Sequence, residues 1–100
     1  MITYTFLTSK NPSLNQIISA LSFYVMSFST PLSSNITING SIGLSMKNGI
    51  VQNIQIIFFD NASEYSYTDP SSGYKVSAQP LSSIPSQSEI ETILSQSGLI

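Results

Sequence analysis

The stretch ITINGSIGLSMKNGIVQNIQIIFF, residues 36–59, contains the two strands on which the predicted fold is built. In its first half, apolar residues alternate with threonine, asparagine and serine up to Met46, which is the pattern of a half-buried strand. In its second half, Ile50–Phe59 is rich in β-branched and aromatic residues and predicts the partner strand. The segment Lys47-Asn48-Gly49 between them contains an Asn-Gly turn signal, so we expect an antiparallel hairpin.

The length of the loop decides the register of this hairpin. A two-residue loop would place Leu44 opposite Asn53 and so set an apolar side chain against a polar one. A three-residue loop pairs Ile42 with Ile54, and it puts Gly49 at the position that needs a left-handed backbone. We therefore expect the three-residue loop, because the register of a half-buried strand follows its hydrophobic pattern.

The segment before this hairpin contains a strand and a helix. Residues 2–8, ITYTFLT, predict the strand, and a long helix is expected over 12–28, with Asn11 as its N-cap and Pro12 in its first turn. Pro31 follows and ends the helix. The apolar stripe of this helix consists of Leu14, Ile17, Ile18, Leu21, Val25 and Phe28.

Two further elements follow the central hairpin. The turn sequence DPSSG lies between two short β-patterned runs and predicts a second hairpin, with Tyr67 opposite Tyr74 across a four-residue loop. Ser86 and Glu89 have the spacing of a capping box, which predicts a final helix. Gly98 supplies the stop signal of that helix.

The predicted fold is α+β, with the element order β-α-β-β-β-β-α. We expect a single compact domain over residues 1–100, because a chain of this length builds one hydrophobic core. An antiparallel sheet of four to five strands packs on the long helix in two layers. This order of elements resembles the cystatin-like arrangement, in which strands wrap one helix. The strand residues expected to meet the helix are Ile38, Ile42, Ile54, Ile56 and Phe58.

Charge is the least ordinary property of the sequence. Charged residues make up 8% of the chain, against about 25% in ordinary globular proteins, and residues 11–46 contain none. Three scattered lysines leave no basic patch for a phosphate backbone, so nucleic acid is not an expected partner. The apolar run 17–28 is interrupted by serines and lacks the basic start of a secretory signal, so we expect neither a membrane span nor a cleavable signal.

The residue types that catalysis needs are scarce. The chain has no histidine and no cysteine, which removes the commonest general base, the commonest zinc ligand and every thiolate. Ser72 and Lys75 have S-x-x-K spacing, but they lie on a turn and a strand and not on a helix. Asp60, Glu64 and Asp69 lie at turn ends, where burial does not push carboxyl pKa values apart. We therefore expect no enzyme, no catalytic or metal-binding residue and no cofactor.

Tyrosine dominates the candidate interaction surface. Tyr65, Tyr67 and Tyr74 form an aromatic stripe on the predicted second hairpin, and Phe23 and Met26 widen the apolar arc of the helix. Tyrosine is favoured at interfaces because it buries a large area at low entropic cost. The alternative is that the stripe is the core side of the sheet or a contact between subunits.

Three asparagines begin glycosylation sequons: Asn35, Asn39 and Asn61. Serine and threonine are so frequent in this chain that such triplets also arise by chance. In the predicted register, Asn39 and Asn61 face the solvent, where a glycan would be accommodated.

The neutral polar composition predicts acidic surroundings and association through uncharged surfaces. In strong acid, carboxylates are protonated and salt bridges fail, whereas a surface of hydroxyls and amides changes little. We therefore expect a non-enzymatic structural subunit that associates with itself, in acidic extracellular surroundings such as those of a virus particle. The alternative is a small binding or inhibitor module, of the host-defence antagonist type, that contacts another protein through the tyrosine hairpin. The oligomeric state in solution separates these two readings.

Overall fold

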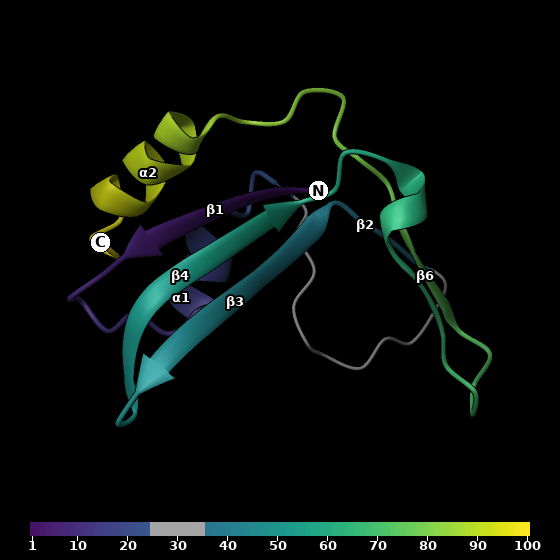
Figure 1. Ribbon diagram of the computed structural model, residues 1–100, viewed down its shortest axis with the longest axis horizontal. Helices are drawn as coiled ribbons and strands as arrows, with labels where there is room; N and C mark the ends of the chain where they lie inside the picture. The colour runs from purple at the N-terminus through teal and green to yellow at the C-terminus, as the bar shows by residue number, and fades with distance from the viewer. Residues whose placement is uncertain (25–35) are drawn as a thin grey trace.

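The computed structural model describes residues 1–24 and 36–100 and confirms an α+β fold in which helices pack against a sheet (Figure 1). The chain runs through β1 (Ile2–Leu7), α1 (Leu14–Ala20), β2 (Ile36–Ile38), β3 (Gly40–Lys47), β4 (Ile50–Phe58), the 3-10 helix η1 (Ala62–Glu64), β5 (Ser66–Thr68), β6 (Lys75–Ala78) and α2 (Gln87–Gln96).

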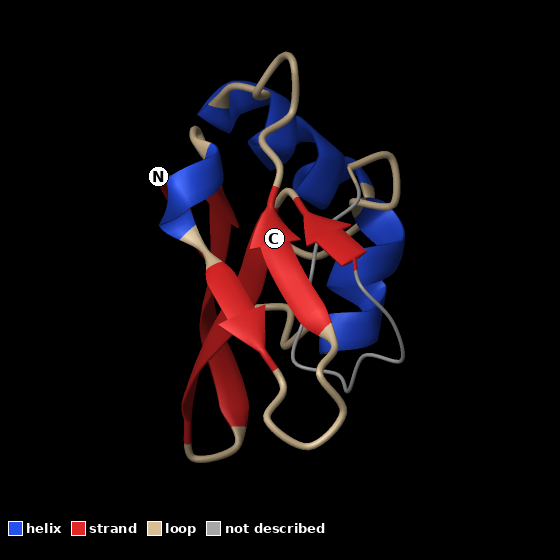
Figure 2. Ribbon diagram, turned by 90° about the vertical axis from the view of Figure 1, so that its right-hand side faces the viewer, coloured by secondary structure: helices blue, strands red, loops and turns tan. Residues whose placement is uncertain are grey.

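The described strands form two sheets and not the predicted single sheet. The main sheet has the strand order β1-β4-β3 and is antiparallel throughout. The second sheet has the order β2-β6-β5, in which β5 and β6 are antiparallel and β2 and β6 are parallel. Figure 2 shows the two longer helices on one side of the main sheet, and Figure 1 shows the second sheet set apart from it. The strands therefore do not wrap one helix continuously, as the cystatin-like order implies.

The predicted strand over 36–46 divides at Asn39 into β2 and β3. The Asn39 side-chain amide donates a hydrogen bond to the carbonyl of Gln79 at 2.7 Å, and the Asn39 carbonyl accepts one from the N–H of Phe59 at 2.9 Å. These two bonds fix a corner, before which the chain pairs with β6 and after which it pairs with β4. Alternation has the same period in either sheet, so the sequence pattern does not reveal the change of partner.

The β3/β4 hairpin combines a two-residue loop with a bulge, so the predicted three-residue loop is wrong. Asn48 and Gly49 have φ values of 54° and 76°, as a type I′ turn requires, and the predicted left-handed Gly49 is confirmed. The register shifts by one residue after Ser45, and Leu44 consequently lies opposite Ile54. Apolar side chains do face each other across the hairpin, but the bulge achieves this and not a longer loop.

Helix α1 begins later and ends earlier than predicted. Its N-cap is Ser13, whose hydroxyl accepts the N–H of Gln16 while the Gln16 side chain accepts the N–H of Ser13. Asn11 cannot cap the helix because its φ is 48°, and its side chain instead accepts the N–H of Val51 at 2.9 Å. The helix ends at Ala20. Two residues of the predicted stripe, Val25 and Phe28, lie outside the described residues.

Helix α2 is confirmed at both ends. The Ser86 hydroxyl accepts the N–H of Glu89 at 3.2 Å. Gly98 has a φ of 73°, and the N–H of Leu99 donates to the carbonyl of Leu94 at 2.9 Å, which is the long bond of a Schellman motif. Because Leu94 and Leu99 are both buried, this cap also anchors the last residues of the chain.

Each sheet has its own hydrophobic cluster. The main cluster lies between the main sheet and the helices and consists of Phe6, Ile17, Leu21, Ile42, Val51, Ile54, Ile56, Phe58, Ile90, Leu94 and Leu99. In the turn after α1, the Tyr24 ring packs edge to face on Phe58, with the ring centroids 5.9 Å apart. The small cluster consists of Ile38, Phe59, Val76 and Ala78. The prediction that Ile38 meets the helix is therefore wrong, because β2 belongs to the second sheet.

The second hairpin lies where it was predicted, with a register displaced by two residues. Tyr67 lies opposite Val76 and not opposite Tyr74. The N–H of Asp69 donates to the carbonyl of Tyr74 at 2.8 Å, so the four-residue loop begins one residue later than expected. Because a strand has a period of two, a shift of two residues leaves every side chain on its predicted face.

Candidate interaction surface

The tyrosine face is the side of the second sheet that carries Tyr65, Tyr67 and Tyr74. Tyr67 lies directly opposite Val76, and directly opposed residues in an antiparallel pair share a face. Tyr65 precedes Tyr67 by two residues and Tyr74 precedes Val76 by two, so the alternation places all of them on one side. The structure therefore brings together the three tyrosines that the sequence analysis grouped.

The tyrosine face lies next to the small cluster and is exposed to solvent. The side chains of Tyr65, Tyr67 and Tyr74 are 39%, 50% and 38% exposed, whereas Val76 beside them is buried. Tyr65 stacks on the buried ring of Phe59 with their centroids 5.9 Å apart, which links the exposed part to the buried part. This face of the second sheet therefore combines exposed aromatic residues with buried apolar ones, an arrangement that suits contact with another protein.

Phe23 belongs to a different part of the molecule. It lies in the turn after α1, is 87% exposed and packs edge to face on Tyr24 at 5.2 Å. Tyr24 contacts Phe58, so this aromatic pair extends the main cluster and not the small one. Met26 lies outside the described residues. The predicted surface therefore divides into a tyrosine part on the second sheet and a phenylalanine part beside α1.

A second surface, the outer face of the main sheet, was missed by the sequence analysis. It is the side turned away from α1, and Figure 1 looks onto it. Its cross-strand rows are Thr3–Ile57–Ser41, Thr5–Gln55–Gly43 and Leu7–Asn53–Ser45. None of these positions is charged. The available signal was the alternation in ITYTFL, but the sequence did not show which strand β1 pairs with.

Strand β3 forms one edge of the main sheet. Because the N–H of Phe59 donates to the carbonyl of Asn39, the odd-numbered residues of β3 direct their backbone groups toward β4. The backbone groups of Ile42, Leu44 and Met46 consequently point away from the sheet. Among residues 1–24 and 36–100, no backbone hydrogen bond joins these groups to another segment.

Two ion pairs meet at the N-terminal amine. The Met1 amine donates to Asp60 at 2.6 Å and to Glu64 at 2.5 Å, and the Asn61 side chain donates to Glu64 at 3.1 Å. Hydrogen bonds to Asp60 and then to Glu64 raise the pKa of the amine. A hydrogen bond with the Glu64 side chain, followed by that from the amine, lowers the pKa of Asp60. This cluster ties the start of β1 to the chain beyond β4.

The other turn acid and its neighbours have structural roles. The N–H of Ser71 donates to the Asp69 carboxylate at 2.9 Å, and this bond, followed by one from the Ser72 hydroxyl, lowers the pKa of Asp69. Ser72 lies in the turn and Lys75 begins β6, so the S-x-x-K residues are not on a helix. Within the described part of the chain, no group of three or more acidic side chains is arranged to hold a metal ion.

Two of the three sequon asparagines are described. The Asn39 amide nitrogen, to which a glycan would be attached, is engaged in the bond to Gln79. Asn61 is exposed and accepts the N–H of Ser63 at 2.9 Å through its side-chain oxygen. Asn35 lies outside the described residues. Modification of Asn39 would disturb the bond at the corner between β2 and β3, and modification of Asn61 would disturb the bond from its amide nitrogen to Glu64.

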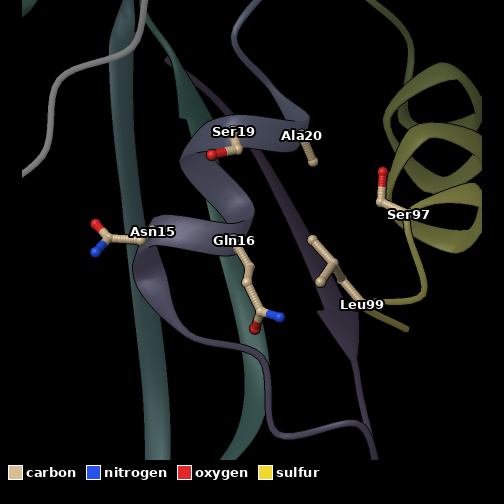
Figure 3. A pocket seen from close by; sticks show the side chains of 6 residues that line it. All are labelled: Asn15, Gln16, Ser19, Ala20, Ser97 and Leu99. Atoms are coloured by element: carbon tan, nitrogen blue, oxygen red, sulfur yellow. The ribbon is translucent and has the colours of Figure 1, made fainter.

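A shallow hollow of about 490 Å³ lies between α1 and the C-terminal end of α2 (Figure 3). It is lined by Asn15, Gln16, Ser19, Ala20, Ser97 and Leu99. The Gln16 side chain already accepts the N–H of Ser13 in the capping box of α1. The hollow therefore offers amide and hydroxyl groups, but no charged or aromatic side chain that would act as an acid, a base or a stacking platform.

No family model, curated protein or solved structure matches this chain. None of the described helices combines the length and the apolar character that crossing a membrane requires.

Proposed function

We propose that this protein is a non-enzymatic structural subunit that associates with copies of itself. The observation that carries the proposal is the outer face of the main sheet, where three rows of side chains are uncharged and neither α1 nor α2 packs, although Ile57 at one end packs on the small cluster. A surface that meets a copy of itself across a two-fold axis brings identical residues close together. A charged side chain near the axis would therefore be repelled by the same charge on the partner. A neutral surface avoids this repulsion.

The setting proposed for this subunit is acidic and extracellular, such as that of a virus particle. Support comes from the composition, since charged residues make up only 8% of the chain. Ion pairs between side chains lose strength when carboxylates are protonated, whereas contacts among hydroxyl, amide and apolar groups do not titrate. An assembly built from such contacts keeps its interfaces as the pH falls.

Mass measurement in solution tests the proposal directly. Light scattering coupled to size-exclusion chromatography, across the micromolar to millimolar range, is expected to show an average mass that rises above that of one chain. Repeating the series at pH 3 is expected to leave the association intact. A monomeric mass at every concentration contradicts self-association, and dissociation at pH 3 contradicts the acidic setting.

A second candidate function is binding of another protein through the tyrosine face. The observation that favours it is that Tyr67 is half exposed and lies beside the buried Val76, so an aromatic ring is available next to a fixed apolar support. A protein that stays monomeric, yet loses capture of a purified partner when Tyr67 and Tyr74 are changed to serine, would favour this function over self-association.

A further inference from the structure

The geometry points to the open edge of β3 as the site at which a second copy of this chain adds its own β3. The two strands run antiparallel and are related by a two-fold axis at Leu44. This inference rests on the proposed self-association and specifies the contact that produces it. It differs from stacking of the outer faces, because it uses backbone groups at an edge and not side chains on a face.

Among residues 1–24 and 36–100, nothing at the edge of β3 supplies the devices that protect ordinary edge strands. Natural edges are blunted by lysine, proline, a bulge on the edge strand or a covering helix or loop. Residues 40–46 contain no charge and no proline, and the extra residue of the bulge, Gln52, lies on β4 and not on β3. The first charged residue of the strand is Lys47, at its end.

The opposite edge of the main sheet, β1, is protected. Figure 1 shows α2 beside β1. The Tyr4 hydroxyl donates to the carbonyl of Pro85 at 2.6 Å, and the Thr8 hydroxyl donates to the carbonyl of Leu99 at 2.6 Å. These bonds hold the segments on either side of α2 against β1. The difference between the two edges selects β3 as the one that accepts another strand.

A two-fold axis at Leu44 gives a register in which the contact complements itself. Leu44 then faces the partner's Leu44, and Ile42 faces the partner's Met46. These are the residues whose backbone groups point away from the sheet, so their N–H and C=O groups meet those of the partner. Their side chains are all apolar, and Met46, which is 57% exposed in one chain, becomes covered.

The same register keeps the lysines apart. Lys47 lies opposite the partner's Ser41, which is uncharged. The two copies of Lys47 are consequently separated by about 20 Å along the strands, at about 3.3 Å per residue. A pairing of one short strand with its copy buries less than the roughly 1,200 Å² of a stable complex, so the dimer is weak and concentration-dependent.

Charged substitutions at Ser41 test the register, because the register determines whether each one strengthens or weakens the dimer. Ser41→Glu sets an acid opposite the partner's Lys47 and is expected to tighten the dimer, whereas Ser41→Lys sets a like charge there and is expected to weaken it. Two symmetric pairs change the dissociation constant by about two- to thirty-fold in each direction. Sedimentation velocity across a concentration series measures this constant, after circular dichroism has shown that each variant is folded.

The matched controls are Thr5→Glu and Thr5→Lys. Thr5 is exposed on the same outer face as Ser41, but it lies on β1, away from the β3 edge. Neither control is expected to alter the dissociation constant measurably. If the Thr5 variants change it and the Ser41 variants do not, the copies stack through their outer faces and the edge pairing is overturned, while self-association stands.

Amide hydrogen exchange gives an independent readout. The amides of Ile42, Leu44 and Met46 are expected to become more protected as the concentration of the folded protein rises. Met46→Pro removes one outward donor without breaking a bond to β4, and it is expected to abolish the dimer, whereas Met46→Ala retains it. A dimer in which these amides gain no protection overturns the edge pairing alone. A chain that stays monomeric overturns both the pairing and the proposed function.

Discussion

The two sheets of this protein are built from similar sequence patterns but are supported very differently. The described main cluster contains eleven buried residues from the main sheet, both helices and the C-terminal segment. The small cluster contains four, from the second sheet and from Phe59, and no described helix contributes to it. Alternation therefore indicates that a segment is a strand, and the amount of apolar surface packed on that strand determines how firmly it is held.

This difference predicts an order of opening. Regions with few buried apolar contacts exchange their amides through local opening at a lower free energy than regions in the main core. The second sheet, with its short strands and exposed tyrosines, is expected to open before the main sheet. Substitutions in each sheet distinguish whether the two sheets unfold as one unit or as two.

The largest effect is expected from Leu21→Ala, in the main cluster. Leu21 is 1% exposed, and truncation leaves a cavity beneath the sheet that costs about 2–5 kcal/mol in the free energy of unfolding. Urea denaturation measures the loss. Ser19→Ala, on the exposed side of the same helix, is the control and is expected to change stability by less than about 0.5 kcal/mol. Equal losses in the two variants would contradict the assigned packing of α1.

A smaller and more local effect is expected from Val76→Ala, in the small cluster. The loss of two buried methyl groups costs about 1.5 kcal/mol, so amides of β5 and β6 are expected to exchange about ten-fold faster. Amides of β4 are expected to keep their exchange rates, because the second sheet opens without them. Equal acceleration in both sheets would show that they unfold as one cooperative unit.

The same contrast explains which parts of the fold were predictable from sequence. Ser86, Glu89 and Gly98 act within one helix, so their local signals predicted both ends of α2. Asn11 was misjudged because its side chain bonds to the N–H of Val51, a partner distant in sequence. The division at Asn39 could not be predicted, because its bond to Gln79 also depends on the tertiary fold.

The candidate site was predictable to the same extent. The grouping of Tyr65, Tyr67 and Tyr74 on one face follows from the period of two, and a register error of two residues did not disturb it. The distance of Phe23 from that group in the fold was not predictable, because it depends on where the chain leaves α1. The edge position of β3 was likewise not predictable, because local sequence patterns do not determine the order of strands in a sheet.

The two hairpin glycines offer a matched pair with a smaller effect. Gly49 and Gly73 have φ values of 76° and 77°, and a Cβ added at either would meet no atom within 4 Å. Valine at either position therefore costs only backbone strain, about 1 kcal/mol or more. Gly49→Val is expected to lower the global free energy of unfolding measured in urea. Gly73→Val is expected to speed exchange in β5 and β6 alone, and a fall in global stability of the same size would contradict separate opening.

The smallest effect is expected from acid. Asp60 and Asp69 have lowered pKa values, so each stabilises the fold above its unfolded pKa and loses that contribution as the pH falls through its folded value. The Met1 amine has a raised pKa, so its contribution is complete below its unfolded value and is lost only as the pH rises through its folded one. Acidification from pH 7 to pH 3 therefore affects the two acids and leaves the amine charged.

Asp60 is exposed and Asp69 is half-buried, and ion pairs and hydrogen bonds to acids in contact with solvent contribute little to stability. Full protonation leaves three lysines and the amine, a charge of about +4 spread over the chain, which repels weakly. The melting temperature by circular dichroism is therefore expected to fall by only a few degrees between pH 7 and pH 3. Asp69→Asn, which keeps an acceptor for the N–H of Ser71, is expected to melt with the same or a slightly smaller pH dependence. A fall of about 20 °C would correspond to several kcal/mol in a domain of this size, more than two solvated carboxylates can supply, and would contradict the acidic setting.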